Sequence, residues 1–176
     1  MSLIFFLEIF MKRTLFYLRK KLILLLCIGA LFCSMLSCGS IERSALELMR
    51  EFTEDYGWEG VIYSPSVREG EAGYADEAFF ESVWGEGVEY VSDFAVVFSS
   101  SLDKSGECAV FICYNDFDAA RVSEMIYRRF DLIASLGIVL DTSSLNDSFV
   151  LRRGRVVVAS ALPDNDRAKS VWKRII

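Results

Sequence analysis

The chain of 176 residues contains no histidine. Histidine is the usual general base of Ser–His and Cys–His catalytic sites, and it is the commonest side-chain ligand of metals such as zinc. Its absence excludes those catalytic arrangements and most zinc sites. We therefore expect the protein to act without a metal or an organic cofactor.

Cysteine is scarce outside the first 38 residues. Three of the five cysteines are Cys27, Cys33 and Cys38, which leaves Cys108 and Cys113 for the rest of the chain. These two lie five positions apart in one apolar run that predicts a strand, so their Cα atoms would be about 16 Å apart. A disulfide requires less than about 7 Å. The spacing predicts two buried, reduced thiols.

Basic side chains are also few once the start of the chain is set aside. Residues 1–37 hold five basic residues and one acidic residue, so the remaining 139 residues hold 14 basic and 24 acidic residues, a net charge of −10. Such a surface repels nucleic acid and anionic lipid headgroups. This charge excludes nucleic acid as a partner, and it predicts that any membrane attachment comes from a covalent lipid.

The first 38 residues have the organisation of a lipoprotein signal. Residues 11–21 are basic, and residues 22–36 are uncharged and mostly apolar. An apolar run of about 15 residues suits the core of a signal peptide better than a bilayer span, which needs roughly 20 residues. Ser37, Cys38 and Gly39 then complete a sequence similar to a lipobox. We expect cleavage after residue 37 and lipidation of Cys38, which would hold the protein on the extracytoplasmic face of the membrane.

Two alternatives concern this leader. The segment could remain uncleaved and act as a membrane anchor, although its apolar run is short. The apolar residues Met1–Phe10 precede the basic region, which is not the usual order of a signal peptide. This order predicts that translation begins at Met11.

After a short tether over residues 38–43, residues 44–176 are predicted to form a single domain. Apolar residues at helical spacing, and runs rich in β-branched residues, give the order helix, two strands, helix, two strands, helix. The expected helices lie at about 44–56, 116–136 and 164–176, with a further short helix at 75–84, and the expected strands lie at 93–98, 107–114, 149–151 and 156–159. This order predicts an α+β fold in which helices pack on one face of a small antiparallel sheet of about four strands.

Four segments suggest chemistry, and each has a simpler interpretation. Ser101–Lys104 matches the S-x-x-K pattern of penicillin-recognising enzymes, but it lies in a polar connection between two predicted strands. Asn115–Asp118 and Asp164–Asp166 could bind calcium, yet both lie where helices begin and can cap them. The acids between Glu69 and Glu89 could include a catalytic pair, or they could form an acidic surface. A cell-envelope hydrolase that uses carboxylates is therefore the alternative function.

Arginine is concentrated at one predicted turn, at Arg152, Arg153 and Arg155. Residues 39–118 have a net charge of −14, whereas residues 119–176 have a net charge of +4. The arginine turn could bind an anionic ligand or the carboxylates of an envelope protein, or it could face the acidic half of its own chain. We take these three arginines as the candidate contact site.

Several segments together resemble a known family. They are Asp93–Ser100, Glu107 with Ala109–Phe111, Asp118–Val122 with Arg128 and Arg129, and Gly154 with Val156–Val158. Over roughly residues 75–175, and in the lipobox, the chain resembles lipoproteins of Gram-positive bacteria that carry domain of unknown function 4358. The resemblance implies an extracytoplasmic lipoprotein, and it supplies no catalytic residues. We expect a non-enzymatic binding or accessory domain at the cell envelope.

Overall fold

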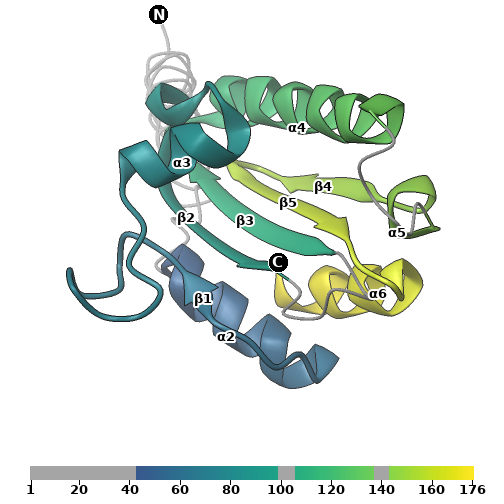
Figure 1. The fold of residues 1–176 in the computed structure, drawn as a ribbon, viewed down its shortest axis with the longest axis horizontal. Helices are drawn as coiled ribbons and strands as arrows, with labels where there is room; N and C mark the ends of the chain where they lie inside the picture. Colours follow the sequence, from purple (N-terminus) through teal and green to yellow (C-terminus); the bar gives the residue numbers. More distant parts are fainter. Residues whose placement is uncertain (1–42, 99–105, 137–142) are drawn as a thin grey trace, which may run out of the picture. The chain divides into compact units, whose positions relative to one another are not determined.

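In a computed structural model of the chain, residues 43–98, 106–136 and 143–176 are described (Figure 1). Residues 43–176 form one compact unit. The predicted signal peptide, most of the tether and the Ser101–Lys104 motif lie outside the described residues.

Five strands in the described part of the chain form one antiparallel sheet in the order β1-β2-β3-β5-β4. The strands are β1 (Ile62–Tyr63), β2 (Val91–Phe98), β3 (Glu107–Cys113), β4 (Phe149–Arg153) and β5 (Val156–Ala161). The helices are α2 (Ala45–Tyr56), α3 (Glu77–Trp84), α4 (Asp116–Leu136), α5 (Ser143–Asn146) and α6 (Asn165–Ile175), with a 3₁₀ turn η1 (Val88–Tyr90). The α+β class is confirmed. The strand that the sequence did not predict is β1, which has only two residues and lies within a glycine-rich segment.

The helices cover both faces of the sheet, whereas the sequence led us to expect helices on one face. Side chains of β3 alternate between two cores: Ala109 and Phe111 belong to the core beneath α3 and α4, and Cys108 contacts Trp172 of α6 on the other side. Figure 1 shows α3 and α4 on one side of the sheet and α2 and α6 on the other. The one-face prediction was wrong because the central strands are apolar at nearly every position, which is the pattern of a sheet buried on both faces.

The core beneath α3 and α4 is built around aromatic rings. Phe80 of α3 meets the ring of Phe94 edge-on, with 5.2 Å between centroids, and Trp84 meets Phe111 at 5.1 Å in the same manner. Edge-to-face contacts of this kind add to the stabilisation that apolar burial provides. Phe80 of α3 and Phe111 of β3 are fully buried, and their rings meet edge-on with 6.0 Å between centroids. This contact holds α3 on the sheet.

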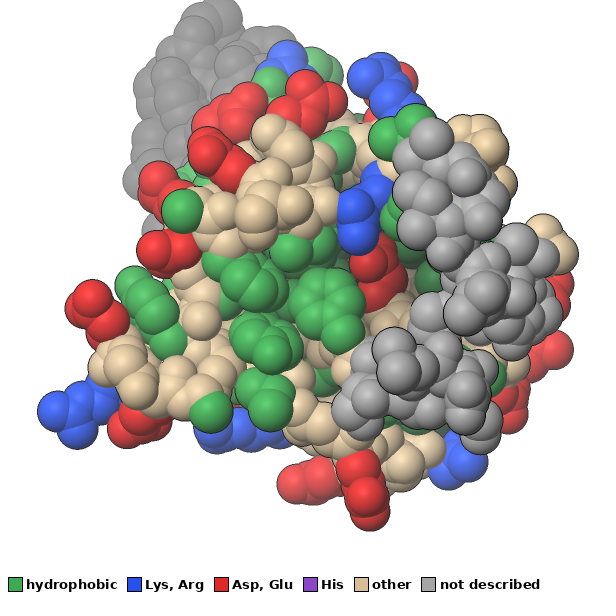
Figure 2. Space-filling view, in the orientation of Figure 1, with side chains coloured by type: hydrophobic (Ala, Val, Ile, Leu, Met, Phe, Trp, Pro, Cys, Tyr) green, Lys and Arg blue, Asp and Glu red, His purple; other side chains and the backbone are tan. Residues whose placement is uncertain are grey.

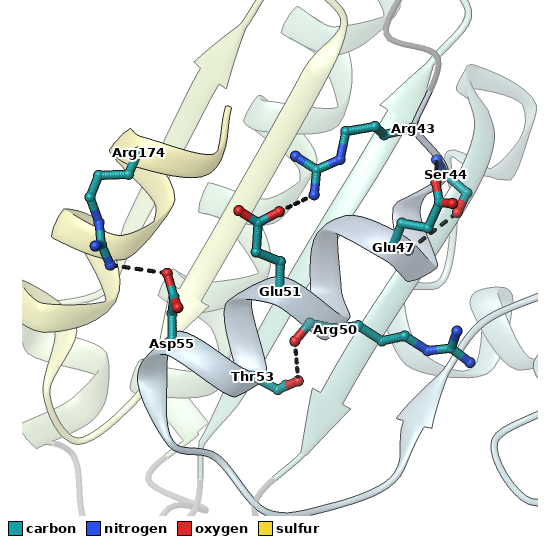
Figure 3. Close-up of polar contacts among 8 residues, drawn as sticks. All are labelled: Arg43, Ser44, Glu47, Arg50, Glu51, Thr53, Asp55 and Arg174. Carbon is teal, nitrogen blue, oxygen red and sulfur yellow. Dashed lines mark hydrogen bonds and ion pairs between the residues drawn. The ribbon is translucent and has the colours of Figure 1, made fainter.

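The second core joins α2 to α6. The ring of Phe52 stacks on Trp172 with 4.6 Å between centroids, and the indole N–H of Trp172 donates to Sγ of Cys108 at 3.3 Å. On the surface above them, Arg174 of α6 forms an ion pair with Asp55 of α2 at 3.1 Å (Figure 3). The buried stack supplies most of the attachment, because exposed ion pairs contribute little.

The first turn of α2 is fixed by its own cap and by a bond to the sheet. Ser44 and Glu47 form the predicted capping box, in which each side chain accepts from the backbone N–H of the other residue (Figure 3). The backbone N–H of Ala45 donates to the carboxylate of Asp93 on β2 at 2.8 Å. Burial raises the pKa of Asp93 despite this bond, whereas hydrogen bonds from Ser44 lower the pKa of Glu47.

We predict that Cys108 and Cys113 are unreactive in the folded domain. Both are free thiols buried on opposite faces of β3, and burial raises the pKa of each to about 12. The thiolate fraction at mildly alkaline pH would then be roughly a thousandfold below that of an exposed thiol. Mass spectrometry of residues 39–176 after iodoacetamide treatment without reductant should show no label in buffer and two labels in denaturant. Rapid labelling in buffer would contradict the burial of these side chains.

We predict opposite pH dependences for substitutions of two carboxylates that accept from backbone N–H groups at the start of α2. Because the folded pKa of Asp93 is raised, its protonation favours the folded state. The free energy of unfolding of the wild type should therefore increase relative to Asp93→Asn as the pH falls from neutral towards about 4. The lowered pKa of Glu47 has the opposite consequence, so the wild type should lose stability relative to Glu47→Gln over the same range. Urea unfolding of the three proteins at several pH values measures both slopes, and equal slopes would refute the assignment.

Candidate functional site

Several elements meet at one end of the sheet, which we call the tether end. Val91, the first residue of β2, lies opposite Cys113, the last residue of β3. The N–H of Cys113 donates to the carbonyl oxygen of Arg155 at 2.8 Å, which places the β4–β5 turn at the same end. The bond from Ala45 to Asp93 brings the start of α2 there as well. The chain therefore enters the folded domain beside the arginine turn.

The structure places the three predicted arginines at or next to the β4–β5 turn but does not bring their side chains together. Arg152 and Arg153 are consecutive residues of β4, so their side chains project to opposite faces of the sheet. Arg153 donates to the carbonyl oxygen of Ile176 at the end of the chain. Arg155 is only half-exposed, while Arg152 and Arg153 are exposed. These residues supply positive charge to the tether end, but they do not form a convergent pocket for a single anion.

Aromatic side chains gather around a further arginine at the tether end. The guanidinium of Arg121 on α4 lies 4.9 Å from the ring centre of Tyr90 and 4.5 Å from that of Phe117. The N–H of Tyr114 donates to the carbonyl oxygen of Tyr90 at 3.3 Å, which holds this tyrosine beside the others. Phe117 is 66% exposed and Tyr114 is 60% exposed. We call Tyr90, Tyr114, Phe117 and Arg121 the aromatic–arginine group.

Sequence reasoning missed this group, although part of the signal was present. Phe117 and Arg121 lie one turn apart on α4, away from the buried positions Val122 and Ile126. An aromatic residue outside the apolar stripe of a helix is a candidate for surface contact. Tyr90 could not be added from sequence, because only the pairing of β2 with β3 brings it to the start of α4.

The opposite end of the sheet carries a second aromatic surface. The rings of Tyr63 and Phe79 stack with 5.2 Å between centroids, and Phe98 lies 5.9 Å from Tyr63. All three are half-buried against the core beneath α3 and α4. Figure 2 shows hydrophobic side chains gathered in the middle of the viewed face, with acidic side chains towards its border.

An ion pair lies in the same region as this second surface. Arg129 of α4 donates through Nε and Nη2 to the carboxylate of Glu107 at 3.2 and 2.9 Å, and its Nη1 donates to the carbonyl oxygen of Val83 at the end of α3. Glu107 lies opposite Phe98 in the sheet. Arg129 therefore ties α3 and α4 to β3, and the carboxylate of Glu107 is already engaged.

Among the described residues, the partly buried acids Asp93 and Glu107 do not form a facing pair of carboxylates. The partly buried carboxylates of Asp93 and Glu107 lie at opposite ends of the sheet, and each is bound to a donor of the domain itself. The acids between Glu69 and Glu89 are all exposed, as the acidic-surface interpretation expects. A glycosidase-like pair would need two facing carboxylates within about 10 Å.

The two candidate calcium motifs act as helix caps, as predicted. The side-chain oxygen of Asn115 accepts from the backbone N–H groups of Phe117 and Asp118 at 2.9 Å, and Asp164 accepts from the N–H of Arg167 at 2.9 Å. Over residues 43–98, 106–136 and 143–176, no group of three or more Cys, Asp or Glu side chains is placed to hold a metal ion. Asn115 and Asp164 therefore serve as the caps of α4 and α6.

Cys38 lies outside the described residues, so its lipidation stays a prediction. Among the helices of the described residues, none has both the length and the apolar character required to cross a bilayer. Comparison of the chain with family models, with curated proteins and with solved structures finds no match.

Proposed function

We propose that the protein is a lipid-anchored, non-enzymatic binding or accessory domain on the extracytoplasmic face of the cell membrane. The observation that carries the proposal is the position at which the described domain begins. The compact unit begins at Arg43, and α2 begins at Ala45, only seven residues after Cys38. The folded domain thus follows the lipobox directly, as expected of a domain that is tethered by its first mature residue.

The charge of the domain supports covalent lipid as the anchor. Residues 38–176 carry a net charge of −10, which opposes binding to a membrane that contains anionic lipid. A single acyl chain gives marginal attachment, while two or more chains anchor a protein stably. A diacylglyceryl group on Cys38 would meet this requirement without help from the protein surface.

A binding role is favoured over hydrolysis by the environment of the polar side chains. The chain has no histidine, and two of the partly buried carboxylates among the described residues, Asp93 and Glu107, are engaged in contacts that hold the fold together. In contrast, exposed aromatic and arginine side chains at the tether end are of the types enriched in binding surfaces. An envelope protein or an anionic ligand is the proposed partner, with Arg152 and Arg153 as candidate contacts. This role agrees with the implied kinship to lipoproteins that carry domain of unknown function 4358, which we also propose.

We predict that Cys38→Ala abolishes processing and stable membrane attachment. The substitution removes the thiol that would carry the lipid, so the precursor should keep its signal peptide. Cys33→Ala is the matched control, because bulky Phe32 precedes Cys33 and makes it a poor lipidation site. Intact mass and detergent phase partition should distinguish the two variants. Normal mass and partition of Cys38→Ala would contradict the proposal, and loss of processing in Cys33→Ala alone would move the site to that residue.

A further inference from the structure

We propose that the tether end of the domain lies against the lipid bilayer, with Tyr114 and Phe117 in the interfacial layer and the neighbouring arginines at the level of the lipid phosphates. This inference rests on the proposed lipid anchor, and it adds an orientation and a contact surface. The lipid would supply the attachment, and the aromatic–arginine group would determine which end of the domain faces the membrane.

The length of the tether restricts which surface can reach the membrane. Six peptide steps separate Cys38 from Ser44, and they span at most about 20 Å when fully extended. The start of α2 is fastened to Asp93, 2.8 Å from the N–H of Ala45. A lipid on Cys38 therefore holds the tether end close to the bilayer.

The aromatic–arginine group lies close to this point of entry. Tyr90 is three residues before Asp93, a distance of about 10 Å along an extended chain. Arg121 lies 4.9 Å from the Tyr90 ring and 4.5 Å from the Phe117 ring, which connects the entry point to the exposed start of α4. The exposed aromatic residues are thus within reach of the same membrane surface as the anchor.

The chemistry of the group suits a lipid interface. Tyrosine is enriched where hydrocarbon meets headgroups, because its ring is apolar and its hydroxyl is polar. Phe117 exposes two thirds of its surface in the domain and would lose that exposure to water among acyl chains. Arginine can bind phosphate in a bidentate manner, and Arg121, Arg152 and Arg153 are present at this end.

The distribution of charge favours the same orientation. The domain carries a net charge of −10, whereas the tether end is closer to balance, because Arg121, Arg152, Arg153 and Arg155 lie there together with the acids Glu47, Glu89, Asp93, Asp116 and Asp118. An anionic leaflet therefore repels other parts of the surface more strongly than this end. The tether raises the local concentration of the aromatic–arginine group at the membrane, so a contact that is weak in the untethered domain becomes populated.

The test compares tryptophan at two exposed positions of α4. Phe117→Trp places the probe at the tether end, and Leu132→Trp is the matched control, since Leu132 is 58% exposed and lies about 22 Å further along the helix. Residues 38–176 carrying either substitution would be joined through Cys38 to a synthetic diacyl lipid bearing a maleimide. The buried Cys108 and Cys113 should not react. The proteins are then bound to vesicles of phosphatidylcholine and phosphatidylglycerol with brominated acyl chains, and the wild type supplies the background of the three native tryptophans.

We expect quenching at position 117 several times that at position 132, with a blue shift of the emission at 117 only. Equal, weak quenching at both positions on vesicle-bound protein would overturn the proposal. A blue shift at 117 that depends on protein concentration without lipid would also overturn it, because a second copy would then cover the group. Because the lipid is attached synthetically, the quenching tests the orientation of the domain independently of the proposed function. If Cys38 proves to carry no lipid in cells, native anchoring is refuted, but the quenching result is unchanged.

Discussion

The fold depends on burial of the central strands on both faces. All six residues of β5, and six of the seven residues of β3, are buried. Strands of this kind cannot face water on either side, because their apolar side chains alternate between the two surfaces of the sheet. Two helical layers are therefore required, and the pairs α3 with α4 and α2 with α6 provide them (Figure 1). Residues that hold these layers, such as Phe80 and Trp172, are fully buried for the same reason.

Most elements could be predicted from sequence because their ends carry local signals. Ser44 with Glu47 marks the start of α2, and Gly57 ends it with a φ of 73° that favours glycine. The presence of two helical layers could be predicted only from a different signal. In Val156–Ala161, polar and apolar residues do not alternate, which indicates a strand buried on both faces. That signal is visible in the sequence, but it competes with the expectation that an antiparallel sheet leaves one face to solvent. The two-residue strand β1 has no comparable signal, since it is defined by pairing with Val96 and Val97.

The candidate site could be predicted only in part, because it is assembled by the register of the sheet. The sequence identified the arginine turn, but consecutive strand residues point to opposite faces, so Arg152 and Arg153 separate. It could not show that this turn lies beside Cys113 and the start of α2. Those neighbours follow from long-range pairing, which one sequence does not reveal. Side chains that share a turn need not share a surface.

The uneven charge of the chain also acquires a physical explanation. Arginines of the C-terminal half bind acids of the N-terminal half away from the tether end: Arg174 pairs with Asp55, and Arg129 pairs with Glu107. At the tether end, the guanidinium of Arg121 instead lies over the rings of Tyr90 and Phe117. A guanidinium that lies on aromatic rings keeps its charge available to a phosphate while its flat faces are covered. Ion pairs between the two halves of the chain therefore connect α6 to α2 and α4 to β3, away from the tether end. At the tether end, arginines lie near exposed aromatic rings, where the chain runs back towards Cys38.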